Sequence, residues 1–272
     1  MLKERVITAV ILALLFLFAL FIFPSSLWAF LVTLMVMQGT WEWSKLAQMR
    51  GIAGVAYMIV TFILFLAILL LYFVFHPQMK SPVQISIYVI ATIFWLILVP
   101  AWFKNGWKIG NPWLLAVLGW ILLIPTGMAM LDLRAINPQP WWLLAVMGLV
   151  WVADISAYFT GRLLGKNKLA PRISPGKTWE GVAGAVVFGL AYVVWVMSIS
   201  GMSQHYSLIL FAIVGVALSV IGDLFESAIK RLAGVKDSGT LLPGHGGLLD
   251  RIDGLTATLP VAALVLILMR YS

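Results

Sequence analysis

Residues 222–253 hold five of the ten acidic residues of a chain in which only 10% of the residues are charged. This stretch reads GDLFESAIKRLAGVKDSGTLLPGHGGLLDRID. It lies between two apolar runs, one ending at Ile221 and the next beginning at Leu255. Carboxylates at the end of a membrane-like apolar run are costly and are usually functional. We therefore expect the chemistry of the protein to be concentrated here.

Helical spacing would bring the charged groups of this stretch onto neighbouring turns. Asp223, Glu226 and Lys230 follow one another at intervals of three and four residues, which places them along one helix face. Asp250 and Asp253 form a second pair beyond a glycine-rich segment. Hard divalent cations such as Mg²⁺ take oxygen ligands, and Lys and Arg side chains suit phosphate oxygens. The two acidic clusters therefore predict metal-assisted phosphate chemistry.

The same stretch resembles the signature of the phosphatidate cytidylyltransferases, also called CDP-diacylglycerol synthases. The resemblance covers 27 residues without a departure from the pattern. Its positions are Ser227, Lys230, Arg231, Lys236, Asp237, Gly239, Pro243, His245, Gly246, Gly247, Asp250, Arg251 and Asp253. It implies transfer of the cytidylyl group of CTP to phosphatidate, which gives CDP-diacylglycerol and pyrophosphate in phospholipid biosynthesis. It also implies Mg²⁺, alone or with a second cation.

Charge and hydrogen-bonding capacity suggest roles within this reaction. Asp223 and Asp250 are the leading candidate metal ligands, followed by Asp253, Glu226 and Asp154. The candidate phosphate binders are Lys177, Lys230, Arg231, Lys236 and Arg251. The candidate catalytic residues are Asp223, Asp250, Asp253, Lys230 and Arg231. The other candidate substrate contacts are Ser174, Thr178, Ser227, Asp237, His245, Gly246 and Gly247.

Several of these residues also have a structural interpretation. Glu226 and Lys230 could form an ordinary surface pair four residues apart on a helix. Asp237 could fix a turn. His245 could serve the turn in which neighbouring glycines supply unusual backbone angles. No second His or Cys stands at metal-ligand spacing from His245 in the sequence, which argues against zinc.

Two other functions are alternatives to cytidylyl transfer. A CDP-alcohol phosphotransferase would carry a D-G-x-x-A-R motif, whereas Asp223 is preceded by Gly222 and followed by Leu224. A lipid or ion transporter would use Asp154 and Asp223 as coupling sites within the membrane. A transporter would not need the GHGGLLDRID segment. Both alternatives fit the residues less well than cytidylyl transfer does.

The composition is that of a polytopic membrane protein. Of 272 residues, 62% are hydrophobic and the mean hydropathy is +1.04, well beyond the usual composition of a soluble domain. The chain has no cysteine, which excludes disulfides and thiolate metal sites. The net charge of +8 is better explained by membrane topology than by a nucleic-acid partner.

About nine apolar runs approach the roughly 20 residues that a membrane helix needs. They are approximately residues 6–23, 26–43, 53–75, 83–103, 112–130, 141–160, 180–199, 207–225 and 254–270. The first run has no signal-peptide cleavage site and is interpreted as a membrane helix. The predicted fold is therefore an all-α polytopic integral membrane protein. Residues 1–140 would form a lipid-facing scaffold able to make homodimer contacts, and residues 141–272 a catalytic region with a polar cavity.

The basic residues predict the orientation of these helices. If the N-terminus is cytoplasmic, the cytoplasmic segments of a nine-helix chain hold 15 Lys and Arg residues. The opposite side holds only Lys80, Arg134 and Arg270. This asymmetry follows the positive-inside rule. We therefore expect a protein of the cytoplasmic (inner) membrane of a bacterium, with its active site facing the cytoplasm.

A second basic segment precedes the apolar run at 180–199. The connection GRLLGKNKLAPRISPGKTWEG carries five basic residues and resembles the family's cytoplasmic loop. It is not a Walker A loop, because Pro171 stands where the first glycine would be. Lys177 and backbone N–H groups at a helix start could hold a phosphate. The alternative is a basic loop that lies near anionic headgroups.

Carboxylates from four predicted elements should reach the same cytoplasmic depth. They are Asp154, Glu180, Asp223, Asp250 and Asp253. We expect them to border a polar cavity that opens to the cytoplasm and, at its side, to lipid. Such a cavity would suit one water-soluble and one lipid substrate. Glu42, between Trp41 and Trp43, is interpreted instead as a solvated acid at the membrane interface.

Cysteine labelling tests the predicted orientation. Because the chain has no cysteine, single cysteines at Lys168 and Ser238 can be labelled without a background signal. We expect an impermeant thiol reagent added outside intact cells to leave both positions unlabelled. A cysteine at Lys80, on the opposite side, is the matched control and should react. Labelling of Lys168→Cys or Ser238→Cys from outside would refute the orientation.

Overall fold

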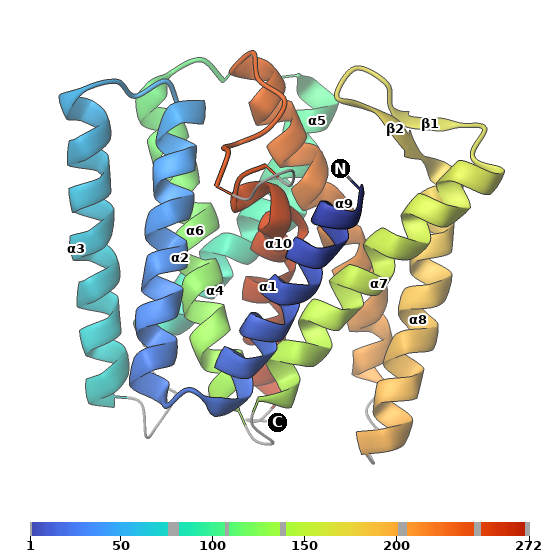
Figure 1. The fold of residues 1–272 in the computed structure, drawn as a ribbon, viewed down its shortest axis with the longest axis horizontal. Coiled ribbons are helices and arrows are strands. Elements are labelled where there is room, and N and C mark those ends of the chain that lie inside the picture. Colours follow the sequence, from blue (N-terminus) through green and yellow to red (C-terminus); the bar gives the residue numbers. More distant parts are fainter. Residues whose placement is uncertain are drawn as a thin grey trace.

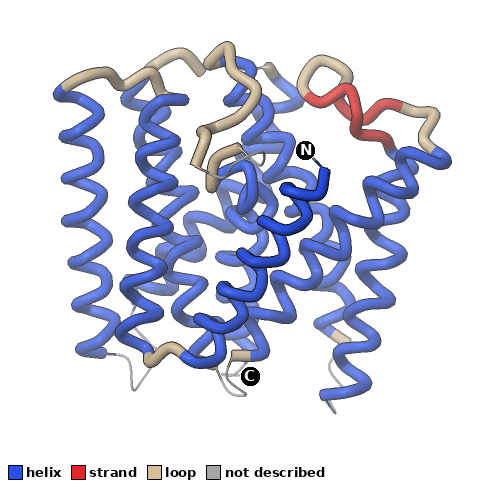
Figure 2. Tube along the Cα trace, in the orientation of Figure 1, coloured by secondary structure: helices blue, strands red, loops and turns tan. Residues whose placement is uncertain are grey.

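Long helices and one small hairpin make up the described part of the chain (Figures 1 and 2). The computed structural model describes residues 2–75, 82–106, 109–136, 140–200, 206–241 and 246–269. The elements are α1 (Leu2–Ile22), α2 (Ser25–Leu46), α3 (Ile52–Phe75), α4 (Pro82–Ile93), η2 (Phe94–Leu98), α5 (Val99–Asn105), α6 (Pro112–Ala135), α7 (Trp141–Leu164), β1 (Lys168–Ala170), β2 (Ser174–Thr178), α8 (Trp179–Ser200), α9 (Ser207–Leu232) and α10 (Leu249–Met269).

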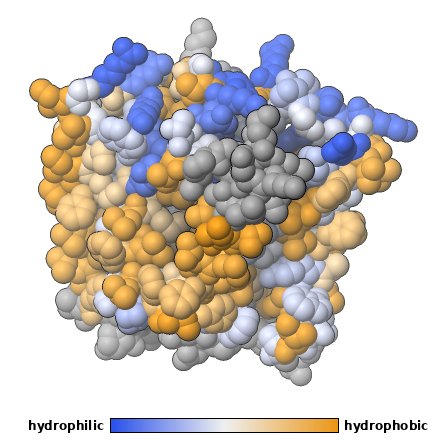
Figure 3. Space-filling model, in the orientation of Figure 1, coloured by the Kyte–Doolittle hydropathy of each residue, from blue (hydrophilic) through white to orange (hydrophobic). Residues whose placement is uncertain are grey.

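Seven helical segments among the described residues are long and apolar enough to cross a membrane. They are α3, the continuous segment α4–η2–α5, α6, α7, α8, α9 and α10. α1 has a shorter apolar part, Val10–Ile22. Apolar residues cover the sides of the helices in Figure 3, and polar residues gather at the end that carries the hairpin. The chain is therefore an all-α polytopic membrane protein apart from the hairpin, and the count of about nine spans stays a prediction.

α6 and α10 form the centre of the bundle. In an apolar stretch of 18 residues, 78% of the residues of α6 and 72% of those of α10 are buried, against 28% in α3 and 22% in α8. α3 and α8 accordingly lie at opposite edges in Figure 1. α10 contacts α9, α7, α6, α4 and α2. It therefore packs against helices from both the first and the second half of the sequence.

Phe225 of α9 lies in an aromatic cluster next to the acidic residues. Its ring stacks on Trp43 of α2 with centroids 6.5 Å apart. It also meets Phe94, Trp95 and Trp102 edge-on at 5.5, 5.4 and 5.4 Å. The π-helical turn η2 lies just before Pro100, near the start of α5. Proline has no backbone N–H, so it cannot donate the regular helical hydrogen bond. The cluster therefore fixes one end of α9 against α2 and this irregular helix.

The two helices that flank the glycine-rich part of residues 222–253, the functional stretch, extend beyond the predicted apolar runs. α9 continues to Leu232 rather than ending near residue 225, and α10 begins at Leu249 rather than near residue 254. Ion pairs and hydrogen bonds stabilise these polar turns, and hydropathy does not detect them. The segment 161–179 contains the antiparallel pair β1–β2, with Lys168 opposite Thr178 and Ala170 opposite Ser174. The hairpin is a local exception to the all-α fold and was not among the predicted elements.

Candidate active site

Two glycines let α9 and α10 pack closely where the acidic residues lie. A Cβ on Gly222 would lie 2.5 Å from the carbonyl oxygen of Asp253, and one on Gly254 would lie 2.8 Å from Ser219 Oγ. A larger residue at either position would push the helices apart. Ser219 Oγ also donates to Asp154 Oδ1 at 3.3 Å. α7, α9 and α10 therefore bring acidic residues to one crossing point.

Asp154, Asp223 and Asp253 form an open carboxylate cluster at this crossing. Asp253 interacts electrostatically with both of the other carboxylates. Asp154 is exposed, and the other two are half-buried. Lys177 Nζ lies 2.6 Å from Asp223 Oδ2, and Ser227 Oγ donates to Asp223 Oδ1 at 3.2 Å. The structure thus brings together five residues that were singled out from the sequence.

The charges of the open carboxylate cluster do not balance. Three carboxylates share the single ammonium of Lys177, so full ionisation of all three would leave two negative charges without a cation. Carboxylate oxygens with excess negative charge are the donor set that Mg²⁺ prefers. No group of three or more Asp, Glu or His side chains in the described residues is already arranged to hold a metal ion. The carboxylate oxygens of the open cluster are nevertheless donors of the kind that a divalent cation takes.

The β1–β2 hairpin positions Lys177. Thr178 Oγ1 accepts from the Gly181 N–H at 3.1 Å, so this buried side chain caps the start of α8. Glu180 accepts from the Asn167 backbone N–H at 3.2 Å and from its Nδ2 at 2.7 Å. Glu180 therefore uses its carboxylate to hold the hairpin. Lys177 lies in β2, next to Thr178, and its ammonium group contacts Asp223 of α9.

Glu226, Lys230 and Asp250 form a buried ion network beside the open carboxylate cluster. Lys230 Nζ lies 3.2 Å from Glu226 Oε1 and 2.6 Å from Asp250 Oδ1. The three side chains are 3%, 10% and 6% exposed, in that order. Each charge therefore depends on the others, because a buried unpaired charge is strongly unfavourable. Glu226 and Lys230 are a helix pair as the alternative interpretation proposed, but the pair is not on the surface.

Asp250 also organises the loop before α10. Its Oδ2 accepts from the backbone N–H groups of Ser238 and Gly247 at 2.9 and 2.8 Å, and from Ser238 Oγ at 3.1 Å. Gly246 has a φ of +83°, and a Cβ there would lie 2.5 Å from the same oxygen. Because Lys230 binds Oδ1, both carboxylate oxygens of Asp250 have partners within the protein.

Glu42 of α2 reaches the same loop from the N-terminal part of the chain. Its side chain is buried, with only 1% of the residue exposed. The carboxylate accepts from Ser238 Oγ at 2.8 Å and from the backbone N–H groups of Leu248 and Leu249 at 2.8 and 2.9 Å. The interpretation of Glu42 as a solvated interfacial acid is wrong. A buried acid with these donors is part of the architecture of the site.

One local feature of the sequence could have indicated a buried Glu42. Gln38 lies four residues earlier in a largely apolar helix and donates to Glu42 Oε1 at 2.9 Å. Such a polar pair on one helix face suggests a shared partner elsewhere. Trp43 is also buried, and its Nε1 donates to the Leu115 carbonyl oxygen at 2.6 Å. Trp41, by contrast, is exposed as an interfacial residue would be.

The remaining predicted residues lie around the same polar end. Arg231, Lys236, Asp237 and Arg251 are exposed there. Arg231 Nη1 donates to the carbonyl oxygen of Val235, just after the end of α9, at 3.1 Å. Ser174 begins β2 and is half-buried. His245 lies outside the described residues.

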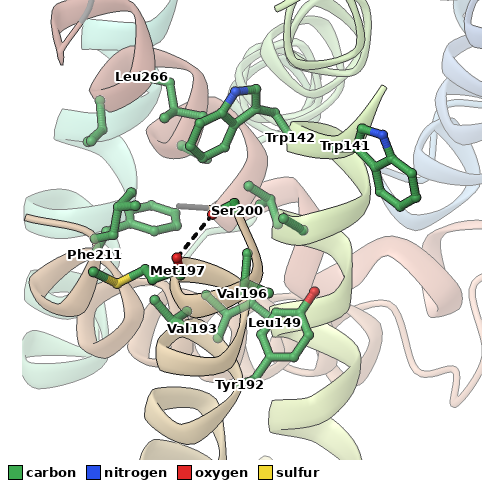
Figure 4. A pocket seen from close by; sticks show the side chains of 15 residues that line it. Trp141, Trp142, Leu149, Tyr192, Val193, Val196, Met197, Ser200, Phe211 and Leu266 are labelled. Carbon is green, nitrogen blue, oxygen red and sulfur yellow. Dashed lines mark hydrogen bonds between the residues drawn. The ribbon is translucent and has the colours of Figure 1, made fainter. Parts of the chain in front are cut away.

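An apolar pocket of about 90 Å³ lies at the other end of α7, α8, α9 and α10 (Figure 4). Its lining includes Trp142 at the start of α7, Ser200 at the end of α8 and Leu266 near the end of α10. A buried cluster separates it from the carboxylates along these helices. The members of this cluster are Leu149, Ala153, Ala185 and Val216. The pocket is therefore distinct from the polar site.

Comparisons with known proteins cover nearly the whole chain. A model described as the cytidylyltransferase family matches residues 3–269. A phosphatidate cytidylyltransferase of Pseudomonas aeruginosa is 39% identical over 275 residues, which are 98% of this chain and 97% of the relative. One of Haemophilus influenzae is 37% identical over 280 residues, 96% of each chain. One of Brucella abortus is 43% identical over 155 residues, 56% of each chain.

Removing Lys230 tests the buried ion network. Lys230→Met keeps the length of the side chain but leaves Glu226 and Asp250 without their shared cation. Breaking a buried ion pair on one side costs about 3–5 kcal/mol, so we expect a clearly lower Tm in detergent. The control is Lys166→Met at an exposed position, which should change stability by less than about 0.5 kcal/mol. Equal Tm values for the two variants would show that the network does not stabilise the fold.

Proposed function

The chain belongs to the cytidylyltransferase family, and we propose that it transfers the cytidylyl group of CTP to phosphatidate. The products would be CDP-diacylglycerol and pyrophosphate, in a step of phospholipid biosynthesis. The similarity to two phosphatidate cytidylyltransferases over at least 96% of this chain carries the proposal. The open carboxylate cluster and Lys177, at the polar end of the membrane helices, support it.

The proposed reaction brings two anionic substrates together. A phosphate oxygen of phosphatidate forms a bond to the α-phosphorus of CTP, while the bond to the oxygen of the β-phosphate breaks and pyrophosphate leaves. A phosphate monoester is already an anionic nucleophile, so a general base is not required. Catalysis then rests on positioning and on neutralising charge. Lys177 and the exposed Arg231, Lys236 and Arg251 are the side chains that we propose for phosphate binding.

The surroundings of the open carboxylate cluster suit one lipid and one soluble substrate. Asp154 is exposed on α7, and its neighbours on that helix include Ile155 and Phe159, which are 59% and 57% exposed. Such apolar side chains are compatible with contact to lipid. The hairpin that carries Lys177 projects at the polar end (Figure 1). We propose that phosphatidate enters from the bilayer and CTP from the aqueous side.

Mg²⁺ is the cation that we propose for the open carboxylate cluster, alone or with a second cation. Asp154, Asp223 and Asp253 would supply oxygen ligands, and the ion would offset the negative charge of the phosphates. Asp250 and Glu226 are also predicted ligands. Because Lys230 and backbone N–H groups already bind their oxygens, we propose that these two residues support the site.

The orientation in the membrane is a further part of the proposal. We propose nine membrane helices with a cytoplasmic N-terminus, in the inner membrane of a bacterium. In Figure 1, α2 runs through the height of the bundle and α1 through most of it, and the distribution of Lys and Arg sets the direction. The polar site would then face the cytoplasm, where CTP is found. A homodimer stays a prediction.

An assay with purified protein tests the reaction. The protein in detergent is incubated with Mg²⁺, phosphatidate and CTP that carries a label in its α-phosphate. We expect a labelled lipid that forms only with phosphatidate, together with an equal amount of pyrophosphate. A CDP-alcohol phosphotransferase would consume CDP-diacylglycerol instead, and a transporter would form no labelled lipid. A folded protein that gives no labelled lipid would refute the proposed reaction.

Removing charge from the two acidic groups should have different consequences. Asp223→Asn and Asp253→Asn should lower turnover by roughly a hundredfold or more, because each removes a ligand of the proposed cation. Raised Mg²⁺ should restore part of the activity, and Tm should change little. Asp250→Asn should lower both turnover and Tm, without rescue by Mg²⁺, because it disrupts the buried ion network. Near-normal turnover of folded Asp223→Asn at limiting Mg²⁺ would exclude the cation site.

A further inference from the structure

Glu42 contacts the start of α10 and the loop before it across about 200 residues of sequence. Its Oε2 accepts from Ser238 Oγ, 196 residues away, and from the Leu249 N–H, 207 residues away. Its Oε1 accepts from the Leu248 N–H, 206 residues away. These donors belong to the same segment that supplies Asp250 and Asp253. A side chain of the N-terminal helices therefore reaches the centre of the functional stretch.

Two glycines of the functional stretch leave space for this carboxylate. A Cβ on Gly247 would lie 2.4 Å from Glu42 Oε2 and 2.2 Å from Ser238 Oγ. The three atoms nearest to a Cβ on Gly239 all belong to Glu42, at 3.0 to 3.2 Å. Neither glycine has a positive φ, so backbone conformation does not require glycine there. The close approach of Glu42 does.

The start of α10 is a place where a negative acceptor is effective. The first N–H groups of a helix have no acceptor within the helix, and the helix dipole adds partial positive charge at that end. The N–H groups of Leu248 and Leu249 lie at this start, and the Leu249 side chain is buried. Water cannot readily replace an acceptor in such surroundings. Glu42 therefore caps α10 from another helix.

We propose that Glu42 is a positioning residue for the reaction. By fixing the start of α10, it sets the place of Asp253, which follows Leu249 by about one helical turn. Because the Asp253 carbonyl oxygen packs closely against Gly222, the position of Asp253 also fixes α9 and with it the open carboxylate cluster. The inference rests on the proposed function, because turnover by that cluster is one of its readouts.

Glu42→Gln is the first test, because it keeps the size of the side chain. In either orientation the amide turns an N–H group toward one of the backbone donors, so the Leu248 or the Leu249 N–H loses its acceptor. A small displacement of reacting groups can lower a rate by roughly a hundredfold. We expect kcat to fall by about ten- to a hundredfold, with a higher Mg²⁺ concentration needed for half-maximal rate. The KM for CTP should change less than kcat.

Asp132→Asn is the matched control. Asp132 is a second buried carboxylate, and it accepts hydrogen bonds from Gln84 and Tyr88. It lies toward the end of α6 that packs near the start of α2, where Trp28 Nε1 donates to the Met130 carbonyl oxygen at 3.2 Å. Glu42 lies near the other end of α2. Asp132→Asn should therefore lower Tm while the folded fraction keeps its kcat and its Mg²⁺ dependence.

Hydrogen exchange gives a readout that does not depend on activity. Backbone amides at 246–252 should exchange faster in Glu42→Gln than in the parent protein, because the acceptor of the Leu248 or Leu249 N–H is lost. The same amides should keep the parent rate in Asp132→Asn. Both proteins are measured without substrate, so the result reports the start of α10 alone.

A double substitution tests whether Gly239 and Glu42 act on each other. Gly239→Ala adds a Cβ against the Glu42 carboxylate and should lower kcat. Glu42→Asp withdraws the carboxylate by one methylene group, so Gly239→Ala should have little further effect in that background. Such non-additivity is expected for residues in direct contact. Fully additive effects on kcat would contradict the contact.

The outcomes separate this inference from the proposed function. If the parent protein forms no labelled lipid, the proposed function fails. If the parent is active and Glu42→Gln is folded with parental kcat, Mg²⁺ dependence and exchange at 246–252, only the positioning role fails. A loss of Tm in Glu42→Gln with unchanged kcat of the folded fraction would likewise overturn it, because that is the behaviour expected of Asp132→Asn.

Discussion

The desolvation of charge at one end of a membrane bundle is the constraint on which this structure depends. A carboxylate removed from water needs a cation, backbone N–H groups or a route back to solvent. Lys230 and the loop before α10 satisfy the buried ion network, and the start of α10 satisfies Glu42. Lys177 only partly offsets the open carboxylate cluster. The open carboxylate cluster is also the more accessible of the two groups, so carboxylates with few protein partners and access from solvent coincide at the proposed cation site.

The same constraint explains why the helices interlock around α10. Ion pairs are useful in a buried setting only when their partners are held in place, and α10 contacts helices from both halves of the sequence. Gly222 and Gly254 remove the side-chain bulk that would separate α9 from α10. One turn further along α9, Phe225 packs among aromatic rings from α2, η2 and α5. Both α10 and this aromatic cluster therefore hold α9 at the level of its carboxylates.

Local patterns predicted the membrane class and most helices, because hydropathy and helical spacing are properties of short segments. Asp154 and Asp223 do lie together as their helix positions suggested. The hairpin before α8 was missed, because a three-residue strand leaves no hydropathy pattern. Glu42 was misread for a different reason. Its partners are about 200 residues away, and spacing within α2 carries no information about a contact of that range.

The functional stretch therefore combines two kinds of acidic residue that its sequence does not distinguish. Asp250 and Asp253 are three residues apart and equally acidic, yet Asp250 binds an ammonium and backbone N–H groups, whereas Asp253 shares Lys177 with two other carboxylates. A residue of the first kind cannot move without leaving a buried charge unpaired. A residue of the second kind gains from a new cation. Burial and hydrogen-bond partners, rather than position in the motif, thus distinguish Asp250, which holds the loop before α10, from Asp253, which we propose as a cation ligand.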